Sequence, residues 1–544
     1  MTADPKAVVA AKARTREVES RFEPMTIGEL VTERCRTLGD APAIDVFDRG
    51  ERATYREVEL LSNRIGNALR AVGVEKGERV GVMLPNRLAY PLTWFALAKI
   101  GAIHVPVNTR YTPREIDYVL RDSGATALVI DAQFLEAFRA LDPRPPGLAD
   151  ARVIVVDGTP PAGMRSFEKL TAAASDASCL DRSLTPGDLV NIQYTSGTTG
   201  FPKGCMQPHE YWVLMSWVMS QWSPKPLGRH FTAQPFFYMD PQWQILKAFR
   251  HGGTLFMAPQ LSASRFIGWL KEHRIEWCQF PELATRQPEA PDDARTALKE
   301  VLGLGWGRDS YRAFRRRFGV TPRDGFGMTE VGLATWTLPE VEQMYDACSV
   351  GLDAPFRETS IRDEAGAPVP PGEVGELWIR GRAMFKGYWN KAEANADAFR
   401  EGGWFRTGDL FRADEQGFLW LVGRLKDMIR RSAENIAARE VEAIVRELPE
   451  VEDCAAVPVP DPRRGEEVKI YVQLKEGLPR ERLPVTEIHR HCSARLAKFK
   501  VPRYYAYVER FPRTSSNKIE KRNLVAGVAD LRAGAWDAEE MVWR

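Results

Sequence analysis

Residues 189–205 read "LVNIQYTSGTTGFPKGC": an apolar run followed by a loop rich in glycine and hydroxyl side chains. Glycine lets the backbone approach a ligand closely and turn its N–H groups into a concavity. Threonine and serine add hydroxyl donors, and Lys203 adds a positive charge, so the loop suits the oxygens of phosphate groups. The Walker A pattern GxxxxGK[ST] does not fit, because Lys203 follows a proline and precedes a glycine. The stretch predicts a buried strand that leads into a phosphate-binding loop.

Short apolar strands alternate with helical patterns through the first half of the chain. This alternation predicts βαβ units and largely parallel sheets that are covered on both faces. Residues 345–422 are instead rich in glycine and proline, with short alternating runs that predict small antiparallel strands. The patterns behind these predictions are "RVGVMLP" (79–85), "YPLTWFALAKIGA" (90–102), "HVPVN" (104–108), "PREIDYVLRDSG" (113–124), "TALVID" (126–131), "GELWIRG" (375–381) and "GFLWLVG" (417–423).

The pattern changes again after residue 427. Val441, Val445 and Leu448 recur at helical spacing, "EVKIYVQL" (467–474) alternates like a strand, and "VTEIHRHCSARL" (485–496) returns to helical spacing. We therefore predict an α/β protein with an N-terminal domain over residues 1–424, which includes a β-rich subdomain at about 345–422. A hinge at 425–427 and a smaller α+β domain at 428–544 complete the predicted organisation.

Composition excludes several classes of protein. The formal net charge of +2 gives no argument for a nucleic-acid partner, and the arginine run at 315–317 is expected on the surface of a helix. Seven scattered cysteines without a CxxC pair predict reduced thiols and a cytoplasmic location. The most apolar helical stretch, "YWVLMSWVMSQW" (211–222), is shorter than the roughly 20 residues of a membrane span, so no membrane insertion is expected. The first twenty residues lack an apolar signal segment and are expected to be flexible.

The segment "YTSGTTGFPKG" (194–204) closely resembles the phosphate-binding signature of the adenylate-forming superfamily, which comprises acyl-CoA synthetases, peptide-synthetase adenylation domains and firefly-type luciferases. The resemblance covers about residues 25–525 and implies a large N-terminal domain of βαβ-type subdomains, a small β-barrel-like subdomain and a mobile α+β C-terminal domain. Four further segments resemble motifs of this superfamily in the expected order: "GFGMTE" (325–330), "WFRTGDL" (404–410), "GRLKDMIRRSAENI" (423–436) and "PRTSSNKIEKRNL" (512–524).

The chain is most similar to AMP-forming acid–CoA ligases. The resemblance implies that a carboxylic acid attacks the α-phosphorus of ATP, that pyrophosphate leaves, and that the thiol of CoA then displaces AMP. Thr329 would bind the α-phosphate, and Glu330 would bind Mg²⁺, which usually takes one or two protein carboxylates plus substrate phosphates. The β- and γ-phosphates would be bound by Thr195, Ser196, Gly197, Thr198, Thr199, Gly200 and Lys203.

The remaining nucleotide contacts follow from the same resemblance. Asp409 would accept hydrogen bonds from the ribose hydroxyls, with Arg424 beside it. Asp324, Phe326 and Gly327 would border the adenine, although the family usually has tyrosine at the position of Phe326. Lys518 would stabilise the charge that develops on the acid and the α-phosphate. Its motif usually reads Gly-Lys and here reads Asn-Lys; asparagine adopts left-handed backbone readily, so we expect the turn to persist.

The thioester step depends on the hinge and on a tunnel for CoA. Lys426 occupies the hinge position of the family, where a change in backbone torsion reorients the small domain. Ala433 and Glu434 would border the tunnel, and Ala433 replaces a usual glycine, which weakens the case for CoA as acceptor. Six basic residues are expected on a solvated face, with contacts to the CoA phosphates as the alternative: Arg430, Arg431, Arg495, Lys498, Lys500 and Arg503.

Aromatic residues are predicted to line the acid pocket. Tyr238, Trp243 and Trp306, with Gly332 nearby, suggest a shortened pocket, which favours a small or medium acid, aromatic or short aliphatic. The alternative is that the tryptophans are core residues. A second carboxylate on the acid, as in carnitine-pathway or dicarboxylate ligases, stays open, with Arg308 as its partner.

Three other functions stay open. A stand-alone adenylation enzyme would load a separate carrier protein instead of CoA, and a luciferase-like oxygenase would share the first half-reaction. A non-catalytic nucleotide-binding relative is the third, but Lys518, Glu330 and Asp409 are all present, which argues against lost activity. The expected partners are the acid, ATP and CoA, with a homodimer as a further possibility.

Overall fold

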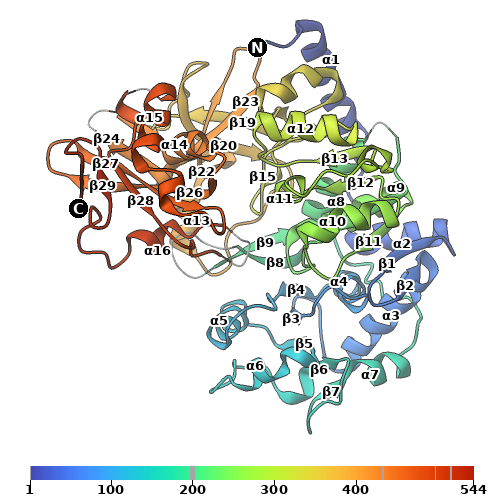
Figure 1. Cartoon of the computed structure of the whole chain (residues 1–544). Helices are drawn as coiled ribbons and strands as arrows, with labels where there is room; N and C mark the ends of the chain where they lie inside the picture. Colours follow the sequence, from blue (N-terminus) through green and yellow to red (C-terminus); the bar gives the residue numbers. More distant parts are fainter. Residues whose placement is uncertain (1, 196–201, 224, 432–433, 497, 515–517) are drawn as a thin grey trace. The chain divides into compact units, whose positions relative to one another are not determined.

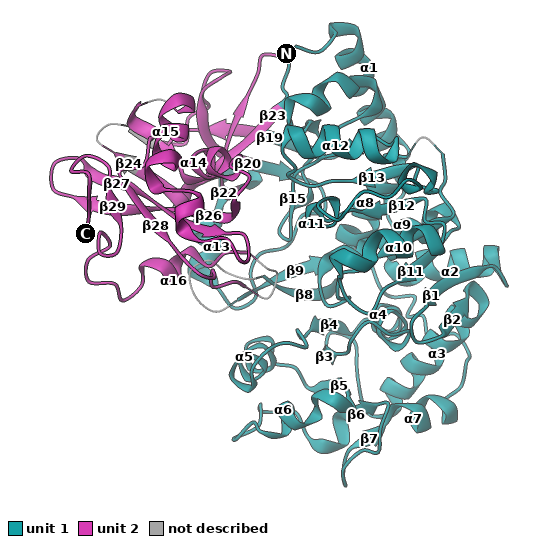
Figure 2. Ribbon diagram, in the orientation of Figure 1, with its two compact units in different colours: residues 1–359, 379–405, 416–418 teal, residues 360–378, 406–415, 419–544 magenta. Residues whose placement is uncertain are grey.

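The computed structural model describes residues 2–195, 202–223, 225–431, 434–496, 498–514 and 518–544. The chain forms two compact units (Figure 2): unit 1 contains residues 1–359, 379–405 and 416–418, and unit 2 contains 360–378, 406–415 and 419–544. Packing defines these units, whereas the predicted domains are separated by a rotating hinge at 425–427. The predicted domain boundaries therefore stay a prediction.

Unit 1 contains a seven-stranded sheet in the order β7-β6-β5-β3-β4-β8-β9, which is parallel except for the β8–β9 pair. Helix α4 connects β3 to β4 and helix α5 connects β4 to β5, which confirms the predicted βαβ pattern. Helix α5 begins with a capping box between Thr112 and Glu115 and ends at Gly124 in left-handed backbone. The strands and helices are β3 (Arg79–Met83), α4 (Ala89–Ile100), β4 (Ile103–Pro106), α5 (Pro113–Ser123), β5 (Ala127–Asp131), β6 (Val153–Val156), β7 (Arg165–Ser166), α7 (Phe167–Ala173), β8 (Leu189–Thr195) and β9 (Lys203–Pro208).

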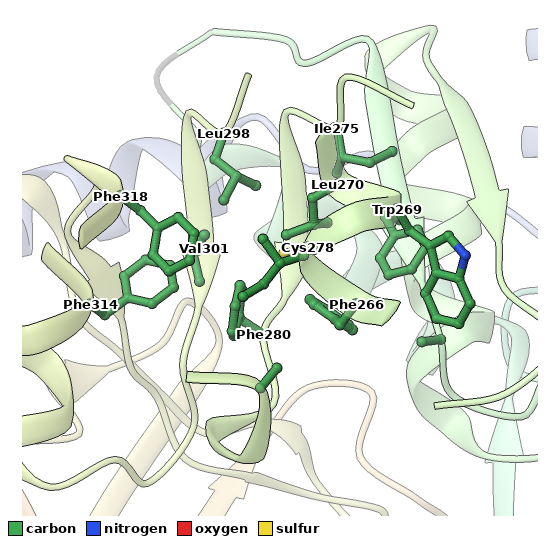
Figure 3. Packing of buried hydrophobic residues seen from close by; sticks show 14 of the residues in the cluster. Phe266, Trp269, Leu270, Ile275, Cys278, Phe280, Leu298, Val301, Phe314 and Phe318 are labelled. Atoms are coloured by element: carbon green, nitrogen blue, oxygen red, sulfur yellow. The ribbon is translucent and has the colours of Figure 1, made fainter. Parts of the chain in front are cut away.

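A second seven-stranded sheet in unit 1 has the order β14-β13-β12-β10-β11-β1-β2 and is parallel except for β1–β2 (Figure 1). Aromatic and aliphatic side chains fill the space between its strands and helices; Figure 3 shows Phe280, Phe314 and Phe318 close to Val301 of β13. The elements are α2 (Ile27–Leu38), β1 (Pro42–Val46), β2 (Glu51–Thr54), α3 (Tyr55–Ala71), α8 (His209–Gln221), β10 (Arg229–Thr232), α9 (Met239–His251), β11 (Thr254–Met257), α10 (Ala263–Glu272), β12 (Trp277–Gln279), β13 (Glu300–Leu302), α12 (Arg308–Phe318) and β14 (Pro322–Arg323).

Short antiparallel strands follow, as the glycine- and proline-rich texture predicts. Two hairpin-like pairs, β15–β16 and β17–β18, precede a five-stranded sheet in the order β19-β20-β22-β21, with β23 paired to β22. The elements are β15 (Gly327–Met328), β16 (Gly332–Leu333), β17 (Thr335–Trp336), β18 (Leu352–Asp353), β19 (Arg357–Arg362), β20 (Val374–Gly381), α13 (Ala392–Ala398), β21 (Phe399–Arg400), β22 (Trp404–Ala413) and β23 (Leu419–Arg424).

The last part of unit 2 is an α+β structure whose predicted apolar faces are confirmed. Val441 and Val445 of one helix, Ile470 of the central strand and Ile488 of the next helix are buried in one core. The elements are β24 (Met428–Arg431), β25 (Glu434–Ala437), α14 (Ala438–Arg446), β26 (Val451–Asp461), β27 (Gly465–Leu474), α15 (Val485–Arg495), β28 (Tyr504–Tyr507), α16 (Lys521–Val525), β29 (Trp536–Asp537) and β30 (Val542–Trp543).

The flexible start expected from the sequence is wrong, because residues 5–20 form helix α1 (Pro5–Ser20). Trp217 donates from its indole to the carbonyl of Val18, and the amide of Phe356 donates to the carboxylate of Glu19 over 2.6 Å. These contacts fix α1 against the rest of unit 1.

All seven cysteines are free thiols, as predicted. Within the described ranges, no helix combines the length and apolarity that a membrane crossing requires.

Candidate active site

The phosphate-loop signature lies between two paired strands of unit 1. Thr195 ends β8, Lys203 begins β9, and the two residues pair across the antiparallel ladder. The hydroxyl of Tyr194 donates to Asp122 of α5 over 2.8 Å, which holds the end of β8. The predictions for Ser196, Gly197, Thr198, Thr199 and Gly200 lie outside the described residues.

The predicted adenine-binding segment is a loop held by hydrogen bonds to its backbone. Asp324 is buried, and its carboxylate accepts from the amides of Gly305 (3.1 Å) and Gly325 (2.7 Å). The hydroxyl of Thr337 donates to the carbonyl of Asp324, and the hydroxyl of Thr335 accepts from the amide of Phe326. Asp324 thus ties two loops together. Its predicted contact with the exocyclic amine of adenine stays a prediction.

Thr329 and Glu330 lie in the turn between β15 and β16. The carbonyl of Thr329 accepts from the side-chain amide of Gln207 (2.9 Å) and from the hydroxyl of Tyr211 (3.0 Å). Glu330 is 7% exposed, and its Oε1 accepts from the hydroxyl of Tyr388 over 2.8 Å. These three partners were not found from the sequence, because each lies far from the turn along the chain.

Gly327 has to be glycine, because a Cβ there would lie 2.7 Å from the carbonyl oxygen of Gly332 across the hairpin. Gly332 itself has φ +71°, in left-handed backbone that glycine favours. The two glycines therefore allow the tight hairpin that carries Thr329 and Glu330.

The surroundings of Glu330 fit the predicted Mg²⁺. Among the described residues, no group of three or more His, Cys, Asp or Glu side chains is arranged to hold a metal ion. Mg²⁺ keeps much of its shell for water and substrate phosphates and commonly uses one or two carboxylates. A single buried carboxylate beside the phosphate-loop lysine suits such an ion better than a cation that needs a full protein shell.

In unit 2 the structure brings two predicted site residues together. Asp409 of β22 and Arg424 of β23 are cross-strand partners, and Nε of Arg424 donates to Oδ1 of Asp409 over 2.9 Å. The side chain of Asp409 is 5% exposed and that of Arg424 is 48% exposed. Burial raises the pKa of the Asp409 carboxyl, and the positive charges of Arg424, Lys518 and Arg439 oppose this rise.

Glu376 is a neighbour of the predicted site that the sequence did not reveal. Its carboxylate accepts from the amide of Gly408 (3.0 Å) and from Arg406 (2.8 Å), while the hydroxyl of Thr407 donates to the carbonyl of Leu377 (2.7 Å). Gly408 has φ +71°, in the left-handed region of backbone that glycine favours. Glu376 on β20 therefore fixes the turn that presents Asp409.

Lys518 is exposed, and its backbone is hydrogen-bonded to Thr514 in unit 2. The amide of Thr514 donates to the carbonyl of Lys518, and the Thr514 hydroxyl accepts from the Lys518 amide. Residues 515–517, including the Asn-for-Gly change, lie outside the described residues. The positive charge of Lys518 acts to lower the pKa of Asp409, so these two predicted site residues share one electrostatic environment.

The predicted hinge residue Lys426 lies in a short 3-10 helix, Leu425–Asp427, between β23 and β24. Ala433 lies outside the described residues, and Glu434 begins β25.

Several of the predicted basic residues are paired within unit 2, which corrects the picture of a free basic face. Arg431 contacts Glu467 over 2.6 Å, Arg503 contacts Asp537 over 3.1 Å, and Lys500 contacts Glu440 over 2.8 Å. These cations are neutralised inside the unit.

The aromatic residues assigned to the acid pocket occupy two kinds of environment. Tyr238 is half-buried and its hydroxyl lies 3.4 Å from the side-chain nitrogen of Asn108. Trp243 is buried and donates to Asp240, and Trp306 packs in the core against Phe280. The core reading that the sequence left open therefore describes both tryptophans, and their place along an acid pocket stays a prediction.

A separate cavity of about 370 Å³ in unit 1 is lined by two residues of α12 and by two short segments near it: Tyr311, Arg315, Thr321, Pro322, Glu342, Gln343, Tyr345 and Asp346. It contains none of the predicted site residues.

The fold and these motifs define an adenylate-forming enzyme. The chain belongs to the AMP-binding enzyme family: the family model matches residues 31–389, and the model of the AMP-binding enzyme C-terminal domain matches residues 440–518. The superfamily is that of the acid–CoA ligases, as the sequence motifs predict.

Relatives and solved structures agree with this assignment. The crotonobetaine/carnitine–CoA ligase of Shigella dysenteriae is 33% identical over 488 residues, which cover 87% of this chain and 93% of that protein. The ATP-bound structure of MatB from Rhodopseudomonas palustris is similar with a TM-score of 0.81 and 26% identity, over 92% of this chain and 98% of the other. An anthranilate CoA ligase in complex with anthranoyl-AMP shares the fold, with a TM-score of 0.84 and 24% identity over 93% and 98% of the two chains.

Proposed function

We propose that this chain, an AMP-forming acid–CoA ligase, activates a small or medium carboxylic acid with MgATP and transfers the acyl group to CoA. The observation that carries the proposal is that the phosphate-loop residue Lys203 and the buried Glu330, which follows Thr329, both contact Tyr388 in unit 1. The acid and the triphosphate are both anions, so the first step needs positive charge and alignment at the α-phosphorus. Lys203 and Mg²⁺ on Glu330 would supply that charge, and Thr329 would hold the α-phosphate.

The chain's own residues define the later contacts. Asp409, already paired with Arg424, would accept from the ribose hydroxyls, and Lys518 would stabilise the developing charge on the acid and phosphate. Rotation at Lys426 would then bring the acyl-adenylate to the CoA tunnel beside Ala433 and Glu434. Formation of the thioester releases AMP.

The loop between β13 and α12 bears on the size of the acid. The Trp306 indole lies about 3.0 Å from where a Cβ on Gly303 would stand, so it fills the space behind this loop. Tyr238 adds a second ring. As borders of the predicted acid pocket, these rings would leave little length for a long alkyl chain. A second candidate is a small acid with a quaternary ammonium group, because aromatic faces attract such cations. The relatives called crotonobetaine/carnitine–CoA ligases are named after acids of this kind.

The test is ATP–pyrophosphate exchange over a panel of acids that includes benzoate, anthranilate, crotonobetaine, carnitine and long-chain fatty acids, each with and without Mg²⁺. Mass spectrometry after CoA addition identifies the thioester. Exchange without any CoA thioester would favour the carrier-loading alternative, and nucleotide binding without exchange would favour the non-catalytic one. The homodimer stays a prediction, which sedimentation velocity tests.

A further inference from the structure

Tyr388 contacts two predicted site residues at once. Its hydroxyl donates to Oε1 of Glu330 over 2.8 Å, and the Nζ of Lys203 lies 3.8 Å from the centre of its ring. Tyr388 is 4% exposed and Glu330 is 7% exposed, so both contacts are shielded from water. A single side chain therefore joins the predicted metal carboxylate to the predicted phosphate lysine.

The backbone of Tyr388 is fixed on the strand that carries Lys203. Residues 387–389 lie beside β9: the amide of Met206 donates to the carbonyl of Gly387, and the amide of Trp389 donates to the carbonyl of Gly204. The side chain of Asn395 brackets Tyr388, because its Oδ1 accepts from the Tyr388 amide (2.7 Å) and its Nδ2 donates to the Tyr388 carbonyl (2.9 Å). The ring consequently has a set position relative to Lys203.

The backbone of Glu330 is fixed as well. Its carbonyl accepts from the amide of Phe385 over 2.9 Å, and the neighbouring Thr329 carbonyl is bound by Gln207 and Tyr211. With the backbone anchored, the hydrogen bond from Tyr388 restrains the orientation of the Glu330 carboxylate. The phenol thereby holds Oε1 of Glu330.

The aromatic contact suits a lysine that has to bind phosphate. Within the part of the chain that the structure describes, Lys203 forms no ion pair, so no carboxylate competes with a nucleotide for its charge. The face of a tyrosine ring attracts an ammonium group through the ring quadrupole and orients it without neutralising it.

We propose that Tyr388 is a positioning residue that pre-organises Glu330 for Mg²⁺ and Lys203 for the β- and γ-phosphates of ATP. This inference rests on the proposed function, since it takes Glu330 as the metal ligand. Groups that hydrogen-bond a metal-ligating side chain fix its orientation, and their loss typically lowers metal affinity about 10- to 100-fold. Tyr388 has this relation to Glu330 and a second, independent relation to Lys203.

The two contacts are separated by two variants and measured by calorimetry of ATP binding, with and without Mg²⁺, in the absence of acid. Tyr388→Phe removes the hydroxyl and keeps the ring. We expect it to reduce the Mg²⁺-dependent gain in ATP affinity about tenfold and to leave metal-free ATP affinity unchanged. Tyr388→Leu also removes the ring, and we expect it to weaken metal-free ATP binding roughly three- to thirtyfold relative to wild type. AMP, which lacks the β- and γ-phosphates, should bind all three proteins equally.

Tyr55→Phe is the matched control, because Tyr55 is buried in the same unit and its hydroxyl donates to the carbonyl of Gly253 over 2.6 Å. It should leave every nucleotide affinity unchanged. Glu330→Gln combined with Tyr388→Phe should lose no more of the Mg²⁺ effect than Glu330→Gln alone, since both act through one carboxylate. Asn395→Ala removes the two hydrogen bonds that hold the Tyr388 backbone and keeps the Tyr388 hydroxyl. It should also reduce the Mg²⁺-dependent gain in ATP affinity, and it provides the test if Tyr388→Phe fails to fold.

An unchanged Mg²⁺ effect in Tyr388→Phe and Asn395→Ala, or additive losses in the double variant, would overturn the role of Tyr388. Equal losses of AMP and ATP affinity would mean that Tyr388 only supports the fold, and would overturn it too. A wild-type chain whose ATP binding does not respond to Mg²⁺ would instead overturn the proposed metal role of Glu330, and this inference with it.

Discussion

Glu300 lies between two buried cations, and its replacement by glutamine is expected to destabilise unit 1 strongly. Oε1 of Glu300 contacts the Nζ of Lys247 over 3.0 Å, and Oε2 contacts Arg323 over 3.0 Å. The side chains of Lys247 and Glu300 are 0% and 6% exposed. Burial lowers the pKa of Lys247 to about 8, against the opposing charge of Glu300. Burial acts to raise the pKa of Glu300, but the charges of Lys247 and Arg323 outweigh it and hold the pKa below its ordinary value.

The magnitude follows from the loss of the only negative charge in this triad. Glu300→Gln keeps the size of the side chain but leaves two cations near each other in a poorly solvated site. Breaking a buried ion pair by removing one partner typically costs about 3–5 kcal/mol. For a unit of this size, that is a fall in melting temperature of roughly 4–6 °C. Because Arg323 immediately precedes Asp324, the affinity for AMP should fall as well.

Thermal and urea unfolding followed by tryptophan fluorescence provide the assay. The control is Glu358→Gln, which breaks an exposed pair with Arg380 (2.7 Å) whose side chains are 41% and 55% exposed. Such pairs contribute about 0–1 kcal/mol, so the control should unfold like the wild type. The folded-state pKa of Glu300 is depressed, so its stabilisation is present above about pH 4.5 and is lost as the pH falls through the folded value. A variant as stable as the control, with the same acid limb as the wild type, would refute this reasoning.

Three further predictions concern the catalytic steps. Asp409 has a raised pKa, so on acidification the affinity for AMP should begin to fall at a pH higher than the usual aspartate pKa of about 4. Asp409→Asn should weaken AMP binding and abolish this pH dependence in calorimetric titrations. Lys518→Ala should reduce pyrophosphate exchange by at least 100-fold, roughly the scale of a lost charge-stabilising group, and should spare thioester formation from supplied acyl-adenylate; equal losses in both assays would remove its assigned role. Lys426→Pro should fix the backbone at the 3-10 helix and impair only one half-reaction, and a uniform loss in both would count against domain alternation.

The elements that are predictable from the sequence are those with a regular pattern or a contiguous motif. The apolar periodicity of Val441, Val445 and Ile488 predicts their burial, and the structure confirms it. Two separate motifs assign Asp409 and Arg424 to one site, and these residues form a cross-strand pair because β22 and β23 are adjacent and antiparallel.

Side-chain direction in irregular segments cannot be predicted in the same way. The glycine-rich loop around Trp306 leaves two positions open from the sequence, the acid pocket and the core, and the structure packs the ring in the core near Phe280 and Phe314. The run of three arginines that ends at Arg317 predicts a surface position, yet Arg317 is buried and pairs with Asp293 over 2.6 Å. A loop or a charge run has no period that specifies which face is inside, so tertiary contacts decide.

The residues that the sequence did not reveal all satisfy or orient groups that the motifs present. Gln207 and Tyr211 bind the carbonyl of Thr329, Glu376 binds the amide of Gly408, and Tyr388 binds the carboxylate of Glu330. A buried backbone group left without a partner is costly, and a carboxylate without one is free to turn, so a site of this kind needs such partners wherever the chain can supply them. Their positions follow from the tertiary fold instead of from local sequence. They lie on β9, α8, β20 and the segment at 386–389, which are distant from the motifs along the chain and adjacent to them in the structure. Groups that face the ligand therefore form short motifs along the chain, while the groups that hold them are dispersed.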